Sequence, residues 1–325
     1  MVKILTKDDV VSLLEMHDCM NVVENAFAEL ANGTAVLPLR TAITPPEGLS
    51  LYMPAYLKES GALACKVVTV YKNNPLKHNL PTTIGKVLLQ NPETGEVICI
   101  MDGGYLTAVR TGAASGVATK YLARKADNQI VSIAGAGVQA KMQLWAVSVA
   151  RKISKAYVYD LNNAAAENFA AEMSKKLSIE VIAVQNSDVM YESDIICLAT
   201  SASQPIIDGN RIKAGTHING IGSHTPNARE LDTASVKLSK FIGDSKEACF
   251  KEAGDLLIPI AEKAISEDHF YAELGEIITA KKAGRINDSE ITLFKSNGLA
   301  VQDAATAKLV YEKSLEKGIG LTVEI

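Results

Sequence analysis

At 325 residues the chain is about twice the size of a typical single domain, so two domains with separate cores are the default expectation. The five cysteines are scattered without a CxxC pair, which is typical of a protein from a reducing compartment rather than of a disulfide framework. The net charge of -4, from 33 basic and 37 acidic residues, argues against a nucleic-acid partner and favours small molecules.

The sequence shows no sign of a membrane segment or of a metal site. Residues 1–10 lack an apolar stretch behind a basic region, and no uninterrupted apolar run reaches transmembrane length. The five histidines form no HxH or HxxxH pair, and no Cys/His group has the spacing of zinc ligands. We therefore expect a cytoplasmic protein that has no membrane partner and no catalytic metal.

The first part of the chain is predicted to combine a helical region with a sheet. Residues 7–31 carry apolar side chains at helical spacing, and Asn32-Gly33 supplies a stop signal. Between Val36 and Met101 the pattern changes to short strand-like runs that are separated by turn signals such as Pro45-Pro46. This pattern favours a mostly antiparallel sheet accompanied by helices.

An Ala/Gly-rich helix over residues 109–123 leads into a different pattern. Between Gln129 and Gly222, short apolar strands alternate with helical stretches, which is typical of a doubly wound parallel sheet of the Rossmann type. Residues 298–317 are again helical and are expected to return to the first domain. We therefore predict an α/β protein with an α+β domain at 1–118 and 299–325 and a Rossmann-type domain at 119–298.

A glycine-rich turn joins the strand at 129–134 to the helix that follows. Gly135-Ala136-Gly137-Val138-Gln139-Ala140 matches the GxGxxA form of the dinucleotide fingerprint. Gly135 permits the tight turn, Gly137 lets the backbone approach a pyrophosphate, and Ala140 lets the helix pack closely on the strand. The helix N-terminus then offers free amides to the phosphates, although a glycine pattern alone also fits a turn that serves only packing.

The next strand ends in Tyr157-Val158-Tyr159-Asp160 and places a carboxylate about 25 residues beyond Gly135, where it would bind the ribose hydroxyls. The following Leu161-Asn162-Asn163 contains no arginine to hold a 2′-phosphate, so we expect NAD(H) to be preferred over NADP(H). Thr200 and Ser201 follow a third strand and are expected to face the cofactor. The alternatives are a helix cap for Asp160 and ordinary loop positions for the other two.

Three cations in the first domain occur among apolar or small residues: Arg40 within 37–41, Lys66 within 64–68 and Arg110 within 108–113. A lone cation in such a setting is commonly a paired structural residue. Their interpretation as a set therefore depends on motifs elsewhere in the chain.

Eight ordered segments carry a resemblance to a known family over nearly the whole chain. They are residues 53–56 (MPAY), 80–83 (LPTT), 101–103 (MDG), 109–115 (VRTGAAS), 135–140 (GAGVQA), 221–226 (IGSHTP), 272–276 (AELGE) and 294–300 (FKSNGLA). In these segments the chain resembles the ornithine cyclodeaminase and mu-crystallin family, which includes archaeal-type alanine dehydrogenase, cyclic ketimine reductases and pyrroline-2-carboxylate reductases. The resemblance implies an oxidoreductase that binds its substrate in the first domain, and a homodimer whose first domains pair through their sheets.

The resemblance also implies that Arg40, Lys66 and Arg110 surround the carboxylate of the substrate. Guanidinium groups hold carboxylates through paired hydrogen bonds, which suits this role. Lys66, crowded by two arginines and partly desolvated, is expected to have a lowered pKa and to donate or relay a proton near neutral pH.

Further positions are assigned by the same resemblance. Five residues match family positions near the cofactor: Thr82, Thr83, Thr111, Ile221 and Ser296. The alternative for the hydroxyl side chains among them is local capping. Glu252 matches an acid on the substrate side in mu-crystallin-like members, and a plain surface glutamate is the alternative.

At His224 the chain departs from ornithine cyclodeaminases and archaeal-type alanine dehydrogenase, which carry aspartate at the matching position. That aspartate is expected to support ring closure on the side-chain amine of ornithine, so its absence argues against true cyclodeamination. A histidine exchanges protons near pH 7, and we assign His224 an acid/base role, with a cap of a tight turn as the alternative.

We therefore expect reduction of a ketimine carboxylate such as pyrroline-2-carboxylate. Arg40 and Arg110 would hold the carboxylate beneath the nicotinamide, hydride would add to the imine carbon, and Lys66 or His224 would protonate the nitrogen. Three alternatives stay open: an alanine dehydrogenase that reductively aminates pyruvate, an ornithine cyclodeaminase, and a non-enzymatic ligand-binding protein like mu-crystallin.

Overall fold

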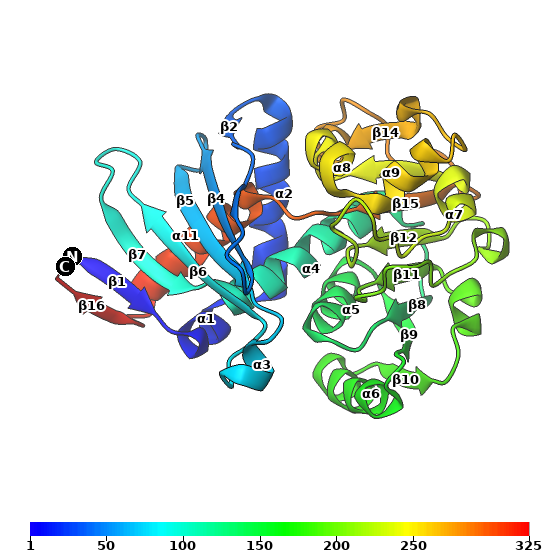
Figure 1. Ribbon diagram of the computed structural model, residues 1–325, viewed down its shortest axis with the longest axis horizontal. Helices are drawn as coiled ribbons and strands as arrows, with labels where there is room; N and C mark the ends of the chain where they lie inside the picture. The colour runs from blue at the N-terminus through cyan, green and yellow to red at the C-terminus, as the bar shows by residue number, and fades with distance from the viewer. Residues whose placement is uncertain (325) are drawn as a thin grey trace. The chain divides into compact units, whose positions relative to one another are not determined.

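The computed structural model describes residues 1–324, which form two compact units (Figure 1). The first unit comprises Met1–Arg110 and Leu299–Ile325, and the second comprises Thr111–Gly298. The boundary after Arg110 falls inside helix α4 (Gly103–Leu122), whereas the boundary predicted from the sequence lies after residue 118. Within residues 1–324, no helix has the length and apolar character needed to span a membrane.

The first unit is built on an eight-stranded sheet in the order β16-β1-β7-β6-β5-β4-β2, with β3 paired to β4. Neighbouring strands are antiparallel except β1 and β7, so the expected mostly antiparallel sheet is confirmed. The strands are β1 (Val2–Leu5), β2 (Ala35–Val36), β3 (Thr41–Ile43), β4 (Leu49–Leu57), β5 (Ala62–Val70), β6 (Thr83–Gln90), β7 (Val97–Asp102) and β16 (Leu321–Val323).

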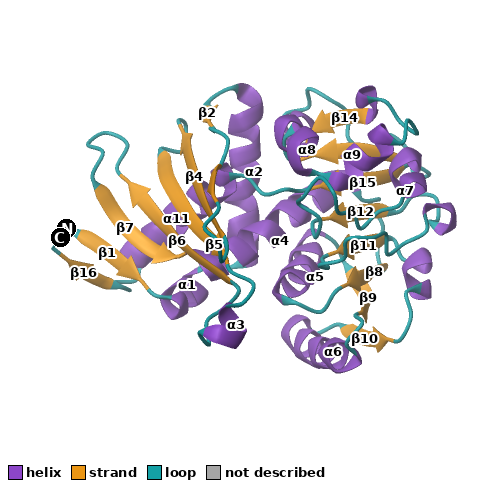
Figure 2. Cartoon of the chain, in the orientation of Figure 1, coloured by secondary structure: helices purple, strands orange, loops and turns teal. Residues whose placement is uncertain are grey.

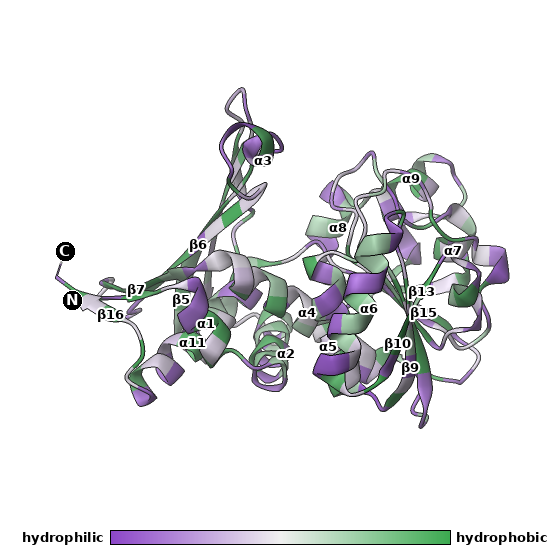
Figure 3. Cartoon of the chain, turned by 90° about the horizontal axis from the view of Figure 1, so that it is seen from below, coloured by the Kyte–Doolittle hydropathy of each residue, from purple (hydrophilic) through white to green (hydrophobic). Residues whose placement is uncertain are grey.

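Helices α1 (Lys7–Leu13), α2 (Met16–Asn32) and α11 (Ala300–Glu316) lie on one side of this sheet (Figure 3), and the short α3 (Asn74–Lys77) precedes β6. The single helical region expected over 7–31 is therefore two helices, because Leu14 and Glu15 adopt extended backbone between them. The stop predicted at Asn32-Gly33 is confirmed, since Gly33 ends α2 with a φ of 75°.

The second unit is built on an eight-stranded parallel sheet in the order β10-β9-β8-β11-β12-β15-β13-β14, which confirms the predicted doubly wound sheet. Four of these strands, β10 and β13 to β15, were not anticipated from the sequence. The strands are β8 (Gln129–Ala134), β9 (Ile153–Tyr159), β10 (Glu180–Val184), β11 (Ile195–Leu198), β12 (His217–Gly220), β13 (Ser239–Gly243), β14 (Phe270–Glu273) and β15 (Ile291–Lys295).

Both faces of this sheet are covered by helices (Figure 2). Ile195 and Cys197 pack in one core with α5 (Val138–Ala150) and α6 (Asn163–Leu177). The alternate residues Ile196 and Leu198 pack in a second core with α7 (Thr233–Leu238), α8 (Lys246–Glu252) and α9 (Gly254–Ala261). Shorter elements are α10 (Leu274–Ile278), η1 (Asp188–Glu192), η2 (Gly209–Arg211) and η3 (Glu267–His269).

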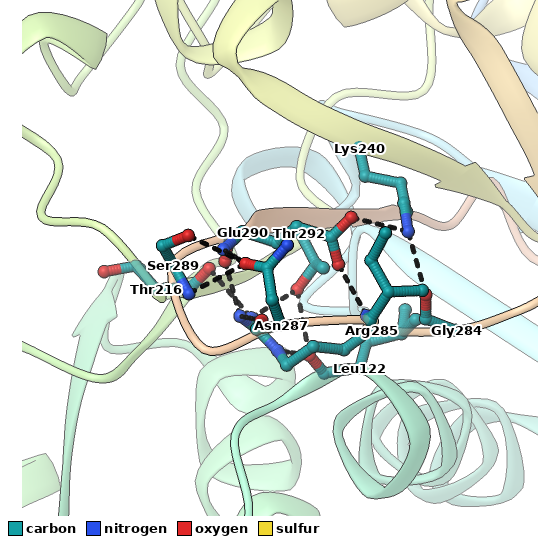
Figure 4. A network of polar contacts seen from close by, with 10 residues as sticks. Leu122, Thr216, Lys240, Gly284, Arg285, Asn287, Ser289, Glu290 and Thr292 are labelled. Carbon is teal, nitrogen blue, oxygen red and sulfur yellow. Dashed lines mark hydrogen bonds and ion pairs between the residues drawn. The ribbon is translucent and has the colours of Figure 1, made fainter.

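A polar network centred on Arg285 lies at the edge of the sheet where β12 and β15 begin (Figure 4). The Arg285 guanidinium donates to Leu122 O from Nε at 2.6 Å and to Thr292 Oγ1 from Nη2 at 3.1 Å. Lys240 forms an ion pair with Glu290 at 2.7 Å. Ligands of parallel α/β sheets bind at the opposite edge, beyond the carboxyl ends of the strands. The network is therefore structural, and the candidate site is sought at the other edge.

Candidate active site

The glycine-rich turn lies at the carboxyl end of β8. Gly135 has a φ of 95°, and a Cβ at this position would lie 2.5 Å from Ala199 O, so both conformation and packing require glycine. Gly137 differs, because its φ of -79° suits any residue and a Cβ there would meet no atom within 4 Å. Open space beside a glycine that the fold itself does not require fits a ligand that approaches the backbone closely.

The same turn leads into the N-terminus of α5, and this end suits an anion. Gly137 is the N-cap, and within residues 1–324 no side chain caps the helix. Val138 is 62% exposed, Gln139 is half-buried, and Ala140 is buried in the core as expected. The first-turn amides thus lie at an accessible, positively polarised helix end, which is where a pyrophosphate binds in dinucleotide folds.

Asp160 directly follows β9 and reaches back to the turn. Its Oδ2 accepts a hydrogen bond from Ala136 N at 2.8 Å, and its Oδ1 accepts one from Asn162 N at 2.8 Å. The helix-cap alternative is wrong, because Asn162 caps α6 by accepting from Ala165 N. The carboxylate therefore sits beside the glycine-rich turn, and the neighbouring Leu161 is 91% exposed.

Two further loops at this edge are joined by Glu230, a buried residue that the sequence analysis did not single out. Thr200 donates to Glu230 Oε1 from N at 2.8 Å and from Oγ1 at 2.7 Å, and Gly222 N donates to Oε2 at 2.7 Å. Burial raises the pKa of Glu230, and the nearby charge of Lys295 opposes this effect. Ser201 is exposed, whereas Ile221 is buried.

A buried ion pair supports the same loops. Lys295 Nζ lies 2.7 Å from Asp255 Oδ2, both side chains are fully buried, and Nζ also donates to Ser223 O. Asp255 Oδ1 in turn accepts from the backbone amides of Glu230 and Leu231 at 2.8 and 3.0 Å. Although burial alone would lower it, the pKa of Lys295 is raised by the charges of Asp255 and Glu230.

His224 and Glu252 lie in the second unit. His224 is exposed, and its Nδ1 lies 3.2 Å from Gly222 O within its own turn, which is the geometry of the capping alternative. Glu252 is half-buried at the end of α8. The acid/base role of His224 and the substrate contact of Glu252 therefore stay predictions.

The remaining cofactor candidates are divided between the two units. Thr82 and Thr83 lie in the first unit, immediately before and at the start of β6. Thr111 begins the part of α4 in the second unit, where its carbonyl accepts from Gln143 Nε2 at 3.4 Å. Ser296 is buried after β15 and donates to Asp244 Oδ2 at 3.0 Å. Their contacts with a cofactor stay predictions as well.

Lys66 and Arg110 are brought together in the first unit. Lys66 lies on β5 with its side chain on the face that α11 covers, and only 2% of that side chain is exposed. Its Nζ lies 2.7 Å from Asp303 Oδ2 on α11. Arg110 Nε donates to Asp303 Oδ1 at 2.8 Å, and its Nη1 donates to Gln302 Oε1 at 2.6 Å. One carboxylate thus holds both cations side by side.

This environment lowers the pKa of Lys66 to about 8. Burial is the largest cause, the charges of Arg110 and of the half-buried Arg40 act in the same direction, and Asp303 opposes them. The lowering expected from the sequence is confirmed, with desolvation rather than the arginines as its main cause.

Asp303 and Gln302 were not predicted as site residues from the sequence, although the sequence holds a signal for them. They are the polar pair in the otherwise small and apolar Ala300-Val301-Gln302-Asp303-Ala304-Ala305, where a lone carboxylate has to find a partner if the helix is buried. Within residues 1–324, no group of three or more His, Cys, Asp or Glu side chains is arranged to hold a metal ion.

Comparison with known proteins gives a family and close structural relatives. The model of the ornithine cyclodeaminase/mu-crystallin family matches residues 2–318. A Delta(1)-pyrroline-2-carboxylate reductase of Bacillus cereus is 38% identical over 316 residues, which is 96% of this chain and 96% of that protein.

Two solved structures resemble the whole chain. The Thermococcus litoralis Delta(1)-pyrroline-2-carboxylate reductase in complex with NADH and L-proline is 51% identical, with a TM-score of 0.95 over 99% of this chain and 100% of that one. An archaeal alanine dehydrogenase dimer with bound NAD is 35% identical, with a TM-score of 0.94 over 100% of this chain and 99% of that one.

Proposed function

The chain belongs to the ornithine cyclodeaminase/mu-crystallin family, and we propose that it is an NAD(H)-dependent oxidoreductase that reduces a cyclic ketimine carboxylate such as pyrroline-2-carboxylate. The observation that carries the proposal is the buried Lys66, which lies beside Arg110 and has a pKa of about 8. A cyclic imine carboxylate needs a cation for its carboxylate and a proton for its nitrogen, and these side chains offer both.

Arg110 and Arg40 are the groups that would bind the carboxylate. Within residues 1–324 the hydrogen bonds of the Arg110 guanidinium use Nε and Nη1, so Nη2 is left for a substrate oxygen. The bonds to Asp303 and Gln302 fix the plane of the guanidinium before the substrate arrives, which reduces the entropy lost on binding. Arg40 acts on the same region, since its charge affects Lys66.

Lys66 is the group that would move the proton. A lysine with a pKa near 8 is largely protonated at neutral pH yet releases its proton far more readily than an ordinary lysine. Protonation of the imine nitrogen makes the adjacent carbon more electrophilic, which favours hydride addition there. In the reverse direction, neutral Lys66 would accept the proton from the amine of the amino acid.

The second unit would bind the nicotinamide cofactor, which supplies the hydride. The α5 N-terminus and the open space beside Gly137 suit its pyrophosphate, and the carboxylate of Asp160 suits the ribose hydroxyls. A 2′-phosphate would meet the negative charge of Asp160 without a compensating arginine in the following loop. We therefore expect NADH to bind more tightly than NADPH, and Asp160→Ser to narrow the difference in their Kd values.

The test of the proposal is a comparison of substrates with the purified protein. NADH oxidation is followed by absorbance with pyrroline-2-carboxylate and, separately, with pyruvate plus ammonia. We expect a higher kcat/KM with the cyclic imine. Preference for pyruvate and ammonia would make the protein an alanine dehydrogenase, while NADH binding without turnover of either substrate would favour a cyclodeaminase or a ligand-binding protein.

The open face of the first sheet fits a homodimer. One register row across β4 to β7 places four half-buried apolar residues on the face opposite α2 and α11: Pro54, Cys65, Leu88 and Ile100. The adjacent row is buried in the core. An apolar sheet face that stays partly accessible to solvent fits an interaction surface, and an archaeal relative is a dimer. Light scattering is expected to give the mass of two chains, and Leu88→Glu is expected to give one, unlike Lys58→Glu on an exposed turn.

A further inference from the structure

The two cations of the first unit depend on a carboxylate that contacts both of them. Asp303 Oδ2 lies 2.7 Å from Lys66 Nζ, and Asp303 Oδ1 lies 2.8 Å from Arg110 Nε. We propose that Asp303 is a positioning residue for the reaction, which holds the ammonium of Lys66 and the guanidinium of Arg110 side by side and keeps Lys66 protonated until the substrate takes the proton. The inference rests on the proposed function for the identity of the reaction.

Geometry separates Asp303 from an ordinary ion-pair partner. Each carboxylate oxygen serves a different cation, so a single side chain fixes the distance between the group that would bind the substrate and the group that would protonate it. Asp303 lies on α11, whereas the cations lie on β5 and α4, and all three side chains are at least 95% buried. Such a bridge limits the rotamers of both cations.

The charge of the Asp303 carboxylate also affects the pKa of Lys66. Arg110 on α4 and Arg40 ahead of β3 both lower the pKa of Lys66, and Asp303 is the group that raises it. Cys19 on α2 also lies nearby, but burial raises the pKa of its thiol to about 12, so it is neutral near pH 7. Without Asp303, a buried lysine would face two arginines and no anion, and it would lose its proton before the substrate needed it.

The alternative is that Asp303 only stabilises the packing of α11. Gln302 provides a matched control, because its Oε1 accepts from Arg110 Nη1 and Leu299 N within the same helical turn, and no hydrogen bond joins it to Lys66 in residues 1–324. Removal of the Gln302 acceptor loosens Arg110 but leaves the charge beside Lys66 in place. The two roles therefore predict different pH profiles for substitutions at neighbouring positions.

The first experiment compares the pH profile of kcat for imine reduction in the wild type, Asp303→Asn and Gln302→Met. In Asp303→Asn the alkaline fall of kcat is expected to move about 1 to 3 units to lower pH, the usual effect of losing an opposite charge next to a titrating group. In Gln302→Met we expect a higher KM with the fall unmoved. Equal displacement in both variants, or none in Asp303→Asn, would overturn the proposal.

A second measurement does not require turnover. The ¹³C resonance of the lysine ε carbon reports the charge state of each lysine, and Lys66→Met identifies the signal of Lys66. The wild-type signal is expected to titrate near pH 8 and the Asp303→Asn signal at lower pH, even if no tested imine is a substrate. An unchanged titration would exclude Asp303 as the anion that retains the proton, whatever the reaction is.

If Asp303→Asn does not fold, Asp303→Glu tests the proposal instead. This variant keeps the negative charge but displaces the carboxylate by one methylene. Its Lys66 signal is expected to titrate close to the wild-type value while KM for the imine rises, because the charge remains and the spacing of the cations changes. A displaced titration together with an unchanged KM would contradict both parts of the proposal.

Discussion

Within residues 1–324, Lys66 is buried against Asp303 in the first unit and Lys295 against Asp255 in the second, and the two pairs have the same Nζ–Oδ2 distance of 2.7 Å. Nevertheless the pKa of Lys66 is lowered to about 8, whereas that of Lys295 is raised. Burial lowers both pKa values and is the largest cause at both sites. The two sites differ in the sign of the third charge, because Lys66 has Arg110 beside its aspartate and Lys295 has Glu230.

The comparison separates a reactive lysine from a structural one without reference to relatives. A buried ion pair by itself says little about function, since its desolvation offsets much of its Coulomb energy. A second cation leaves the lysine ready to release its proton, while a second anion holds the proton in place. Lys66 is therefore expected to react, and Lys295 to hold together the loops after β11 and β12.

The largest effect is expected from removal of the reactive lysine. Lys66→Met should lower kcat for imine reduction about 10²- to 10⁴-fold, the usual contribution of a positioned proton donor. The Kd for NADH, measured by fluorescence, should stay near the wild-type value, because Lys66 lies in the first unit and the glycine-rich turn in the second. Unchanged turnover would remove Lys66 from the chemistry.

The same substitution in the other pair should affect folding instead. Lys295→Met leaves Asp255 and Glu230 buried without their cation and is expected to destabilise the protein by about 3 to 5 kcal/mol in urea unfolding, as is usual for breaking a buried pair. Lys66→Met should destabilise it less, because Asp303 retains Arg110. Equal losses would show that the third charge does not distinguish the pairs.

The pH dependence of the reaction should follow Lys66 alone. Below about pH 8 Lys66 is protonated and can act as the acid, so kcat for reduction should be flat there and fall as the pH rises through 8, about tenfold per unit. Lys295 should not contribute in this range, because its pKa is raised above the usual value for lysine. The measurement is kcat at saturating imine and NADH, and a fall that persists in Lys66→Met would assign it to another group.

The sequence predicts the second unit better than it predicts which buried charges pair with one another. The glycine-rich turn and the strand–helix alternation predict that unit, whereas Lys66 is singled out by the resemblance to the family, because a cation in an apolar strand is by itself commonly a paired structural residue. Asp303 is 193 residues from Arg110, and helical periodicity does not reveal which face of α11 meets β5. Which charged residues pair with each other across such sequence distances is known only from the folded structure.

Errors in the predicted elements also have local causes. The sequence does not reveal the break between α1 and α2, because the two extended residues at the break are neither proline nor glycine. The capping box of Thr6 and Asp9 does mark where α1 begins. Strands β13 (SKFIG) and β14 (FYAE) each contain a charged residue among five and four positions, so they lack the continuous apolar run that marks a short buried strand. In the structure both strands contribute a phenylalanine to the second core, together with residues of α8 and α9.

The smallest effect is expected when the third charge of the structural pair is neutralised. Glu230 accepts hydrogen bonds from Thr200 and Gly222, which is the pattern of an ionised carboxylate. A lysine with a raised pKa stabilises the fold below its unfolded pKa, and this stability is lost as pH rises through the folded pKa. Glu230→Gln removes one of the two anions that raise the pKa of Lys295. The folded pKa should then move toward the unfolded value, so less stability is lost on the alkaline side and the loss is complete at a lower pH. Urea unfolding across the alkaline range measures the size and the end of this loss. An unchanged loss would mean that Asp255 alone holds the proton of Lys295, and the contrast between the two pairs would then depend on Arg110.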